Sequence, residues 1–134
     1  MTRFSKITGI LAALALALGC GDDGGGTPPP VPGDLTLSYA QSGRPLGAVL
    51  LTISGGSIEA VTAIPAGLAV ASADQTAGVT RIVISGTLTP GDMLKITVPD
   101  VNASDAYIVR VDQAADVETF ALLEPSLSVF TLHR

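Results

Sequence analysis

Alternating apolar and polar positions recur along the chain after residue 34, in short runs separated by glycine and proline. In the run 79–85, Thr80, Ile82 and Ile84 share one parity, and Val79, Arg81, Val83 and Ser85 share the other. Side chains of a β-strand change face at every residue, so this alternation predicts half-buried strands. The clearest such runs are residues 35–39, 79–85, 93–98 and 106–111.

Three other segments are less regular. Residues 48–54 are apolar at both parities, which predicts a central or covered strand. Residues 57–74 are weakly periodic and interrupted by Pro65, and Ser57 could cap a short helix through Ala63. The β-branched side chains in that segment favour a strand instead. Residues 126–134 predict a terminal strand.

Turn-forming residues separate these runs at the spacing expected of an all-β sandwich or barrel. They lie at residues 43–45, 55–56, 65–67, 78, 90–92, 99–100 and 124–125. We therefore predict an all-β fold, an antiparallel β-sandwich of eight or nine strands without a long helix.

The first 19 residues follow a different pattern. Arg3 and Lys6 precede an uncharged, mostly apolar stretch at residues 7–19. A basic start, a short apolar stretch and a small residue at its end are typical of a secretory signal peptide. The stretch is shorter than the roughly 20 apolar residues of a transmembrane helix.

The single cysteine, Cys20, directly follows this stretch. Ala17, Leu18, Gly19 and Cys20 resemble the lipobox of bacterial lipoproteins, although Ala17 stands where the family usually has leucine. The resemblance implies cleavage before Cys20 and attachment of acyl chains such as palmitate to it, and stable anchoring takes more than one chain. The alternatives are a free thiol in a secreted protein and a retained N-terminal anchor. Gly21 in place of aspartate favours the outer membrane by the enterobacterial sorting pattern.

Residues 20–33 predict a flexible linker, because three glycines precede a proline-rich segment that favours extended polyproline II. The expected organisation is a signal peptide at 1–19, a lipidated cysteine and linker at 20–33, and one domain at 34–134. The processed chain would carry five basic and twelve acidic residues, a net charge of −7. That balance argues against nucleic acid as a partner.

Residues 47–56 (GAVLLTISGG) and 80–101 (TRIVISGTLTPGDMLKITVPDV) resemble the cohesin-type β-sandwich modules. The resemblance covers residues 47–111 and rests on turn glycines and strand alternation. It implies a jelly-roll-like sandwich, related in fold to some carbohydrate-binding modules, that acts in protein–protein attachment.

Candidate catalytic chemistry is sparse. His133 is the only histidine and lies next to the C-terminus, and no GxSxG or HExxH motif occurs. Asp112, Asp116 and Glu118 around the sequence QAAD could serve as glycosidase acids, or form a solvated acidic rim at a turn. Asp100, Asn102, Ser104 and Asp105 resemble the opening of a calcium loop without its later glycine and glutamate. The other interpretation is a turn in which Asp and Asn bond their own backbone.

We expect the core to take most of the aromatic side chains Tyr39, Tyr107, Phe120 and Phe130, which disfavours a sugar-binding platform. The sequence thus predicts a lipid-anchored protein of the bacterial cell envelope, facing the periplasm or the cell surface. Its domain is expected to be a non-enzymatic protein-binding or scaffold module without a cofactor or metal. The expected partners are membrane lipid, through Cys20, and an envelope protein. The alternatives are a small envelope hydrolase that uses the acidic cluster, and a carbohydrate-binding module.

Overall fold

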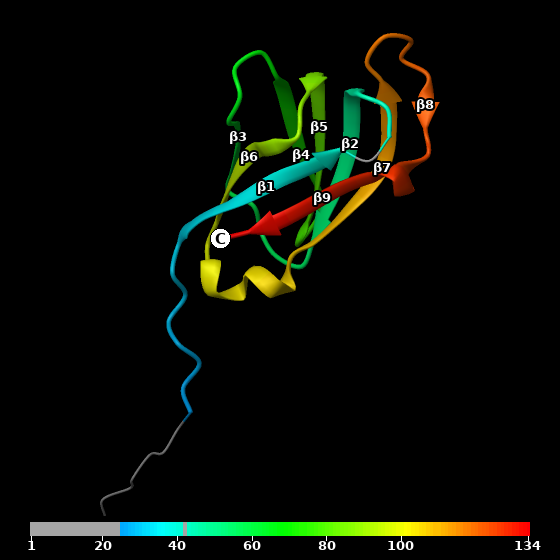
Figure 1. Ribbon diagram of the computed structural model, residues 1–134. Coiled ribbons are helices and arrows are strands. Elements are labelled where there is room, and N and C mark those ends of the chain that lie inside the picture. Colours follow the sequence, from blue (N-terminus) through cyan, green and yellow to red (C-terminus); the bar gives the residue numbers. More distant parts are fainter. Residues whose placement is uncertain (1–24, 42) are drawn as a thin grey trace, which may run out of the picture.

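The computed structural model describes residues 25–41 and 43–134. In these ranges, nine β-strands form two antiparallel sheets that pack face to face, with two short 3-10 helices between strands (Figure 1). The predicted all-β sandwich is confirmed. The predicted signal peptide and Cys20 lie outside the described residues.

The smaller sheet has four strands in the order β3-β6-β1-β9. Their bounds are Ala60–Ala63 for β3, Gly91–Val98 for β6, Gly33–Gln41 for β1 and Ser128–His133 for β9. β1 pairs with β6 on one side and with the C-terminal strand β9 on the other. The two ends of the described chain are thus joined within one sheet.

The larger sheet has five strands in the order β4-β5-β2-β7-β8. Their bounds are Ala69–Thr76 for β4, Val79–Leu88 for β5, Leu46–Ser54 for β2, Ile108–Asp116 for β7 and Leu122–Leu123 for β8. The doubly apolar run 48–54 belongs to β2, which lies between β5 and β7. The expectation of a central strand is confirmed.

The core lies between the sheets and is made by residues of one parity from each strand. Leu35 and Leu37 of β1 face inward beside Ile96 and Leu94 of β6. In the other sheet, Leu51 of β2 pairs with Ile82 of β5 and with Val111 of β7. The parity predicted for the clearest runs is therefore confirmed, except at Met93, which the alternation of residues 93–98 placed opposite Leu94 and which the structure also buries. The residues buried in the core are Leu35, Leu37, Tyr39, Leu46, Val49, Leu51, Ile53, Ile82, Ile84, Leu88, Met93, Leu94, Ile96, Val98, Val101 and Ala114.

Three local expectations need correction or refinement. The strand expected from residue 106 begins at Ile108, because the 3-10 helix η1 (Val101–Ala106) precedes it, with the Asp100 side chain as its N-cap. The sequence QAAD (residues 113–116) is not a turn but the end of β7. Asp112, directly before it, is an extra residue at a register shift against β2. Residues 57–63 do not form a helix, and the strand β3 occupies their second half.

Gly47 brings the end of β7 close to β2. A β-carbon at Gly47 would lie 2.7 Å from the Cα atom of Val117, a distance that real side chains do not reach. The register of β2 shifts at this point against both of its neighbours. Glycine is required here because the backbones approach so closely, and the approach positions the turn after β7.

The segment before β1 leaves the sandwich at its η1 end. Residues 25–32 form no regular element and are exposed. The Val31 amide donates to the Asp100 carboxylate, and the Val101 amide donates to the Val31 carbonyl. The turn between β7 and β8 lies at the other end of the sandwich (Figure 1). Within the described ranges, no helix has the length and apolar character needed to cross a membrane.

Candidate functional site

The outer faces of the two sheets differ in chemistry. On the four-stranded sheet, the residues between the core positions are mostly polar: Thr36, Ser38, Thr62, Lys95, Thr97, Thr131 and His133. On the five-stranded sheet, the corresponding residues are mostly small or apolar: Ala48, Leu50, Ala69, Ala71, Val83, Ala115 and Leu122. We call the second set the apolar face. It is the larger departure from an ordinary solvated sheet surface.

The centre of the apolar face is a row across three strands. Leu50 of β2 pairs with Val83 of β5 and with Gln113 of β7, and Val83 pairs with Ala71 of β4. Leu50, Val83, Gln113 and Leu122 line a shallow hollow of about 220 Å³, and Leu122 is 72% exposed. Apolar side chains that surround an open hollow are typical of a contact surface for another molecule.

A second hollow of about 410 Å³ adjoins the first, and Ala48 lines both. Its other lining residues include Val117 and Phe120 from the turn between β7 and β8. Phe120 is 69% exposed, and its backbone φ is +55°. A bulky residue in this left-handed region is uncommon and strained. The turn therefore holds an exposed aromatic ring at the end of the apolar face, in a conformation that its residue type disfavours.

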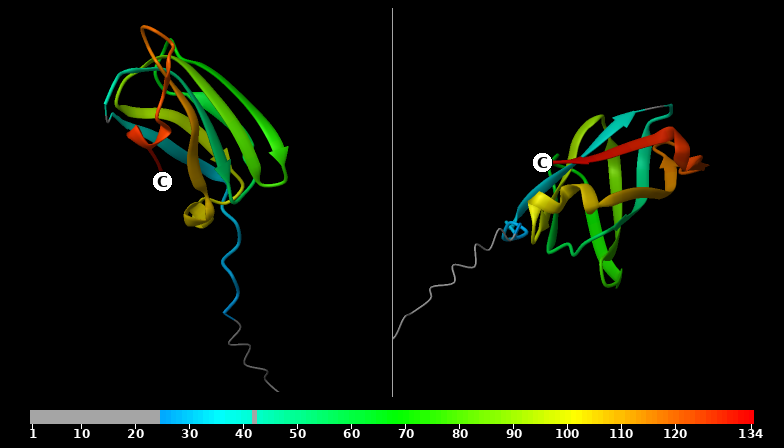
Figure 2. Two further views of the ribbon diagram at one scale, coloured as in Figure 1. Left: turned by 90° about the vertical axis from the view of Figure 1, so that its right-hand side faces the viewer. Right: turned by 90° about the horizontal axis from the view of Figure 1, so that it is seen from below.

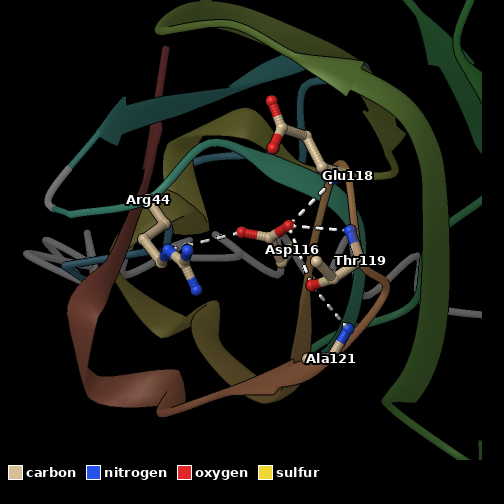
Figure 3. A network of polar contacts seen from close by, with 5 residues as sticks. All are labelled: Arg44, Asp116, Glu118, Thr119 and Ala121. Carbon is tan, nitrogen blue, oxygen red and sulfur yellow. Dashed lines mark hydrogen bonds and ion pairs between the residues drawn. The ribbon is translucent and has the colours of Figure 1, made fainter.

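Asp116 holds this turn in place (Figure 3). The residue is 4% exposed, and its side chain accepts hydrogen bonds from the backbone amides of Glu118 and Thr119, each at 2.9 Å, and from the Thr119 hydroxyl. The Phe120 amide donates to the Asp116 carbonyl. The bonds from the Thr119 and Glu118 amides lower the pKa of the Asp116 carboxyl, and the Arg44 guanidinium at 3.6 Å adds a smaller effect.

Asp116 points inward, whereas Asp112 lies on the outer side of the five-stranded sheet, in the same surface as the apolar face. Asp112 accepts hydrogen bonds from the Thr52 hydroxyl and from Arg110, and Thr52 lies between the buried residues Leu51 and Ile53. The bond from Thr52, with the smaller contribution of Arg110, lowers the pKa of the Asp112 carboxyl. Thr52 pairs with Arg81 of β5 and with Arg110 of β7, so two arginines and one aspartate lie in the row next to that of Leu50 and Val83.

The acidic residues predicted as one cluster are therefore not together. Asp116 points into the end of the sandwich, Asp112 points outward, and Glu118 is exposed on the turn. The interpretation as a solvated rim is wrong for Asp116, which is buried and bonded to the turn. The sequence predicted a turn at QAAD, but β7 continues through these residues. The bulge at Asp112 changes the face to which the following side chains point, so Asp116 points inward.

The calcium-like segment has a structural role. One Asp100 side-chain oxygen accepts from the amides of Val31 and Asn102, as in the self-bonded turn considered as the alternative. The Asn102 side chain accepts from Arg134. Ser104 and Asp105 lie within η1. Among the described residues, no group of three or more histidine, cysteine or acidic side chains is arranged to hold a metal ion.

The remaining sequence candidates lie apart from one another. His133 is exposed on the outer face of the four-stranded sheet, where it pairs with Thr36. Tyr39 is buried and stacks on Phe130, with ring centroids 4.9 Å apart, and Tyr107 packs against the core. The expectation that most aromatics join the core is confirmed, with Phe120 as the exception.

Comparison of the chain with protein-family models, with curated proteins and with solved structures finds no match. Sequence reasoning did not identify the apolar face as a candidate site. The available signal was the run 48–54, whose second apolar parity contains Leu50.

Proposed function

We propose that the protein is a lipid-anchored component of the bacterial cell envelope whose β-sandwich binds another protein through the apolar face. One observation carries this proposal: the two outer faces of the same sandwich differ, and the apolar one surrounds a hollow. Exposed apolar surface costs free energy in water, and a partner that covers it recovers about 25 cal/mol per Å². The binding role agrees with what the resemblance to cohesin-type modules implies.

The face also indicates the chemistry of its partner. Leu50 and Val83 lie near its centre, and Arg81 and Arg110 lie in the next row along the strands. Asp112 neutralises part of this positive charge through its two bonds to Arg110. A protein surface with an apolar centre and a carboxylate at one side would complement this arrangement.

The anchor is proposed from the lipobox-like sequence that ends at Cys20. The attachment of Val31 to Asp100 and Val101 supports a defined exit of the chain at the η1 end. Twelve residues can span at most about 40 Å when a chain is fully extended. A domain anchored from this end presents the Phe120 turn farthest from its attachment, which suits contact with a partner rather than with the anchoring membrane.

The alternative functions have weaker support. A glycosidase needs two carboxyl groups that flank one bond, whereas Asp112 and Asp116 lie on opposite faces of their sheet, and the pKa values of both are lowered rather than raised. A carbohydrate-binding module uses exposed aromatic rings to bind sugars, and among the described residues Phe120 is the aromatic residue exposed beside the apolar face. The apolar aliphatic centre at Leu50 and Val83 favours a protein partner over a sugar.

Photo-crosslinking in cells tests the binding proposal. A photoreactive amino acid replaces Leu50 or Val83 on the apolar face, or Thr36 or Thr97 on the polar outer face as matched controls. We expect a discrete crosslinked species from Leu50 and Val83 and none from the controls, and we expect Leu50→Asp to abolish the crosslink at Val83. Equal crosslinking from both faces, or crosslinking from the controls alone, would contradict the proposal.

A further inference from the structure

The first strand of the five-stranded sheet, β4, has an open edge. It pairs with β5 along one side, and no described residue pairs with the backbone of its other side. All but one of its eight residues are exposed. The hairpin that it forms with β5 projects from the sandwich (Figure 2). An exposed strand edge is a template for another strand, because its amides and carbonyls lack partners in the sheet.

The other three sheet edges differ from β4. β8 has two residues and β3 has four, and Ile64 and Pro65 directly follow β3. β9 has six residues, and the 3-10 helix η2 (Pro125–Leu127) directly precedes it. β9 contacts β7 of the other sheet, as β4 contacts β3, so these contacts do not distinguish the two edges and their lengths do. The edge that offers the longest pairing stretch among the described residues is therefore β4.

Residues 69–73 of β4 lack the features that normally protect an edge strand, and these features occur only at its end, as Asp74 bonded to the buried Thr80 and as the register shift after Asp74. Natural edges carry lysine, proline, an inward charge or a bulge. The segment 69–73 contains only alanine, valine and serine. Asp74 is the one charged residue of β4, and its carboxylate accepts from the Thr80 hydroxyl of the neighbouring strand. A register shift between Asp74 and Thr76 limits the regular edge to residues 69–74.

We propose that β4 pairs antiparallel with β4 of a second copy of this chain, so that the two five-stranded sheets become one continuous sheet of ten strands. A two-fold interface requires that the same surface is complementary to itself. The uncharged segment 69–73 meets this requirement because it opposes no like charges. With the two-fold axis at Ser72, Asp74 lies opposite Val70 of the other copy, and the two aspartates stay apart.

The pairing has a consequence for the apolar face. Ala69, Ala71 and Ala73 face outward on β4 and continue the rows that contain Ser85, Val83 and Arg81 of β5. The dimer therefore joins two apolar faces side by side on one surface. Its two-fold axis is perpendicular to the sheet and reverses the strand direction between the copies, so the two N-terminal segments leave at opposite ends of the continuous sheet.

The first test is the mass of the detergent-solubilised full chain, measured by light scattering and by sedimentation over a range of concentrations. We expect a dimer for the native chain. Ala71→Lys, which places two like charges beside the axis, should raise the dimer dissociation constant at least about tenfold. Thr131→Lys, on the exposed polar face of β9, is the matched control and should leave it unchanged. Circular dichroism checks that both variants stay folded.

A second test keeps the inference falsifiable if Ala71→Lys disturbs the fold. Cysteine is introduced singly at residues 69–74 in membranes, and disulfide formation is followed without reductant. Directly opposed β-carbons lie close enough for a disulfide only near the axis, so one or two neighbouring positions should crosslink. A monomeric native chain, a dimer unchanged by Ala71→Lys, or a strand of another envelope protein crosslinked at these positions overturns the inference. The mass of the purified chain is measured without any envelope partner, so a failure of the dimer and a failure of the crosslink at Leu50 can be told apart.

Discussion

Leu50 and Leu51 are neighbours of the same type on opposite faces of β2, and replacing each with alanine separates stability from binding. Leu51 is 0% exposed and packs between Ile82 and Val111 in the pairing of its sheet. Truncation loses about 0.8 kcal/mol for each buried CH₂ group and leaves a cavity, so Leu51→Ala should cost about 3–4 kcal/mol. Leu50 is half-buried and opens onto the hollow, so Leu50→Ala leaves no closed cavity and should cost about 1 kcal/mol or less.

Urea unfolding of the Cys20→Ser chain measures both values. With a slope of about 1–3 kcal/mol per M, Leu51→Ala should lower the midpoint by about 1–4 M. Leu50→Ala should change the midpoint little, while it weakens the crosslink measured at Val83. A one-residue change of register would exchange the two effects. Equal losses of stability, or a greater loss for Leu50→Ala, would refute the assignment of the two faces.

Three further predictions address the turn and the anchor. Asp116→Asn should reduce stability at neutral pH, and its difference from the native chain should begin to shrink as the pH falls below about 4 and vanish below the lowered pKa of Asp116. The sign follows from the lowered pKa of Asp116, whose stabilisation is present above the unfolded pKa and lost through the folded one; a difference that grows in acid would contradict it. Phe120→Asn should leave stability unchanged or raise it by up to about 1 kcal/mol, because asparagine tolerates a φ of +55°, yet it should weaken binding. Cys20→Ser should stop incorporation of labelled fatty acid and move the protein from the membrane to the soluble fraction, and a variant still bound to membranes would exclude the lipid anchor.

The sequence was sufficient for the sandwich because its strands are half-buried. Ile82 and Ile84 alternate with Arg81 and Val83, and the structure buries the first pair and exposes the second. Such alternation is a local property that survives without knowledge of strand partners. The same reasoning indicated a central position for residues 48–54, because both parities there are apolar.

The site was harder to predict because it depends on contacts between distant segments. Thr52 and Asp112 are 60 residues apart, and Val31 and Asp100 are 69 apart. The bulge at Asp112 reverses the parity of the residues after it, and nothing in the sequence QAAD marks it. Because β7 continues to Asp116, this carboxylate is buried and accepts hydrogen bonds from the following turn, and it is not part of a solvated acidic rim.

The features that sequence reasoning missed gather in one region, and this coincidence supports the proposed binding role. Local sequence preferences and the global fold usually agree, and departures from them concentrate at functional sites. Glycine or asparagine would satisfy a φ of +55° without strain, and a polar side chain would suit a position that is 69% exposed. Phe120 is unfavourable on both grounds, and the buried carboxylate of Asp116 holds its turn through three hydrogen bonds. A turn that served only to connect β7 with β8 would need none of these features. A partner that covers the aromatic ring at the end of the apolar face would account for all of them, because burial of the ring recovers the free energy of its exposure and offsets the backbone strain that keeps it in place.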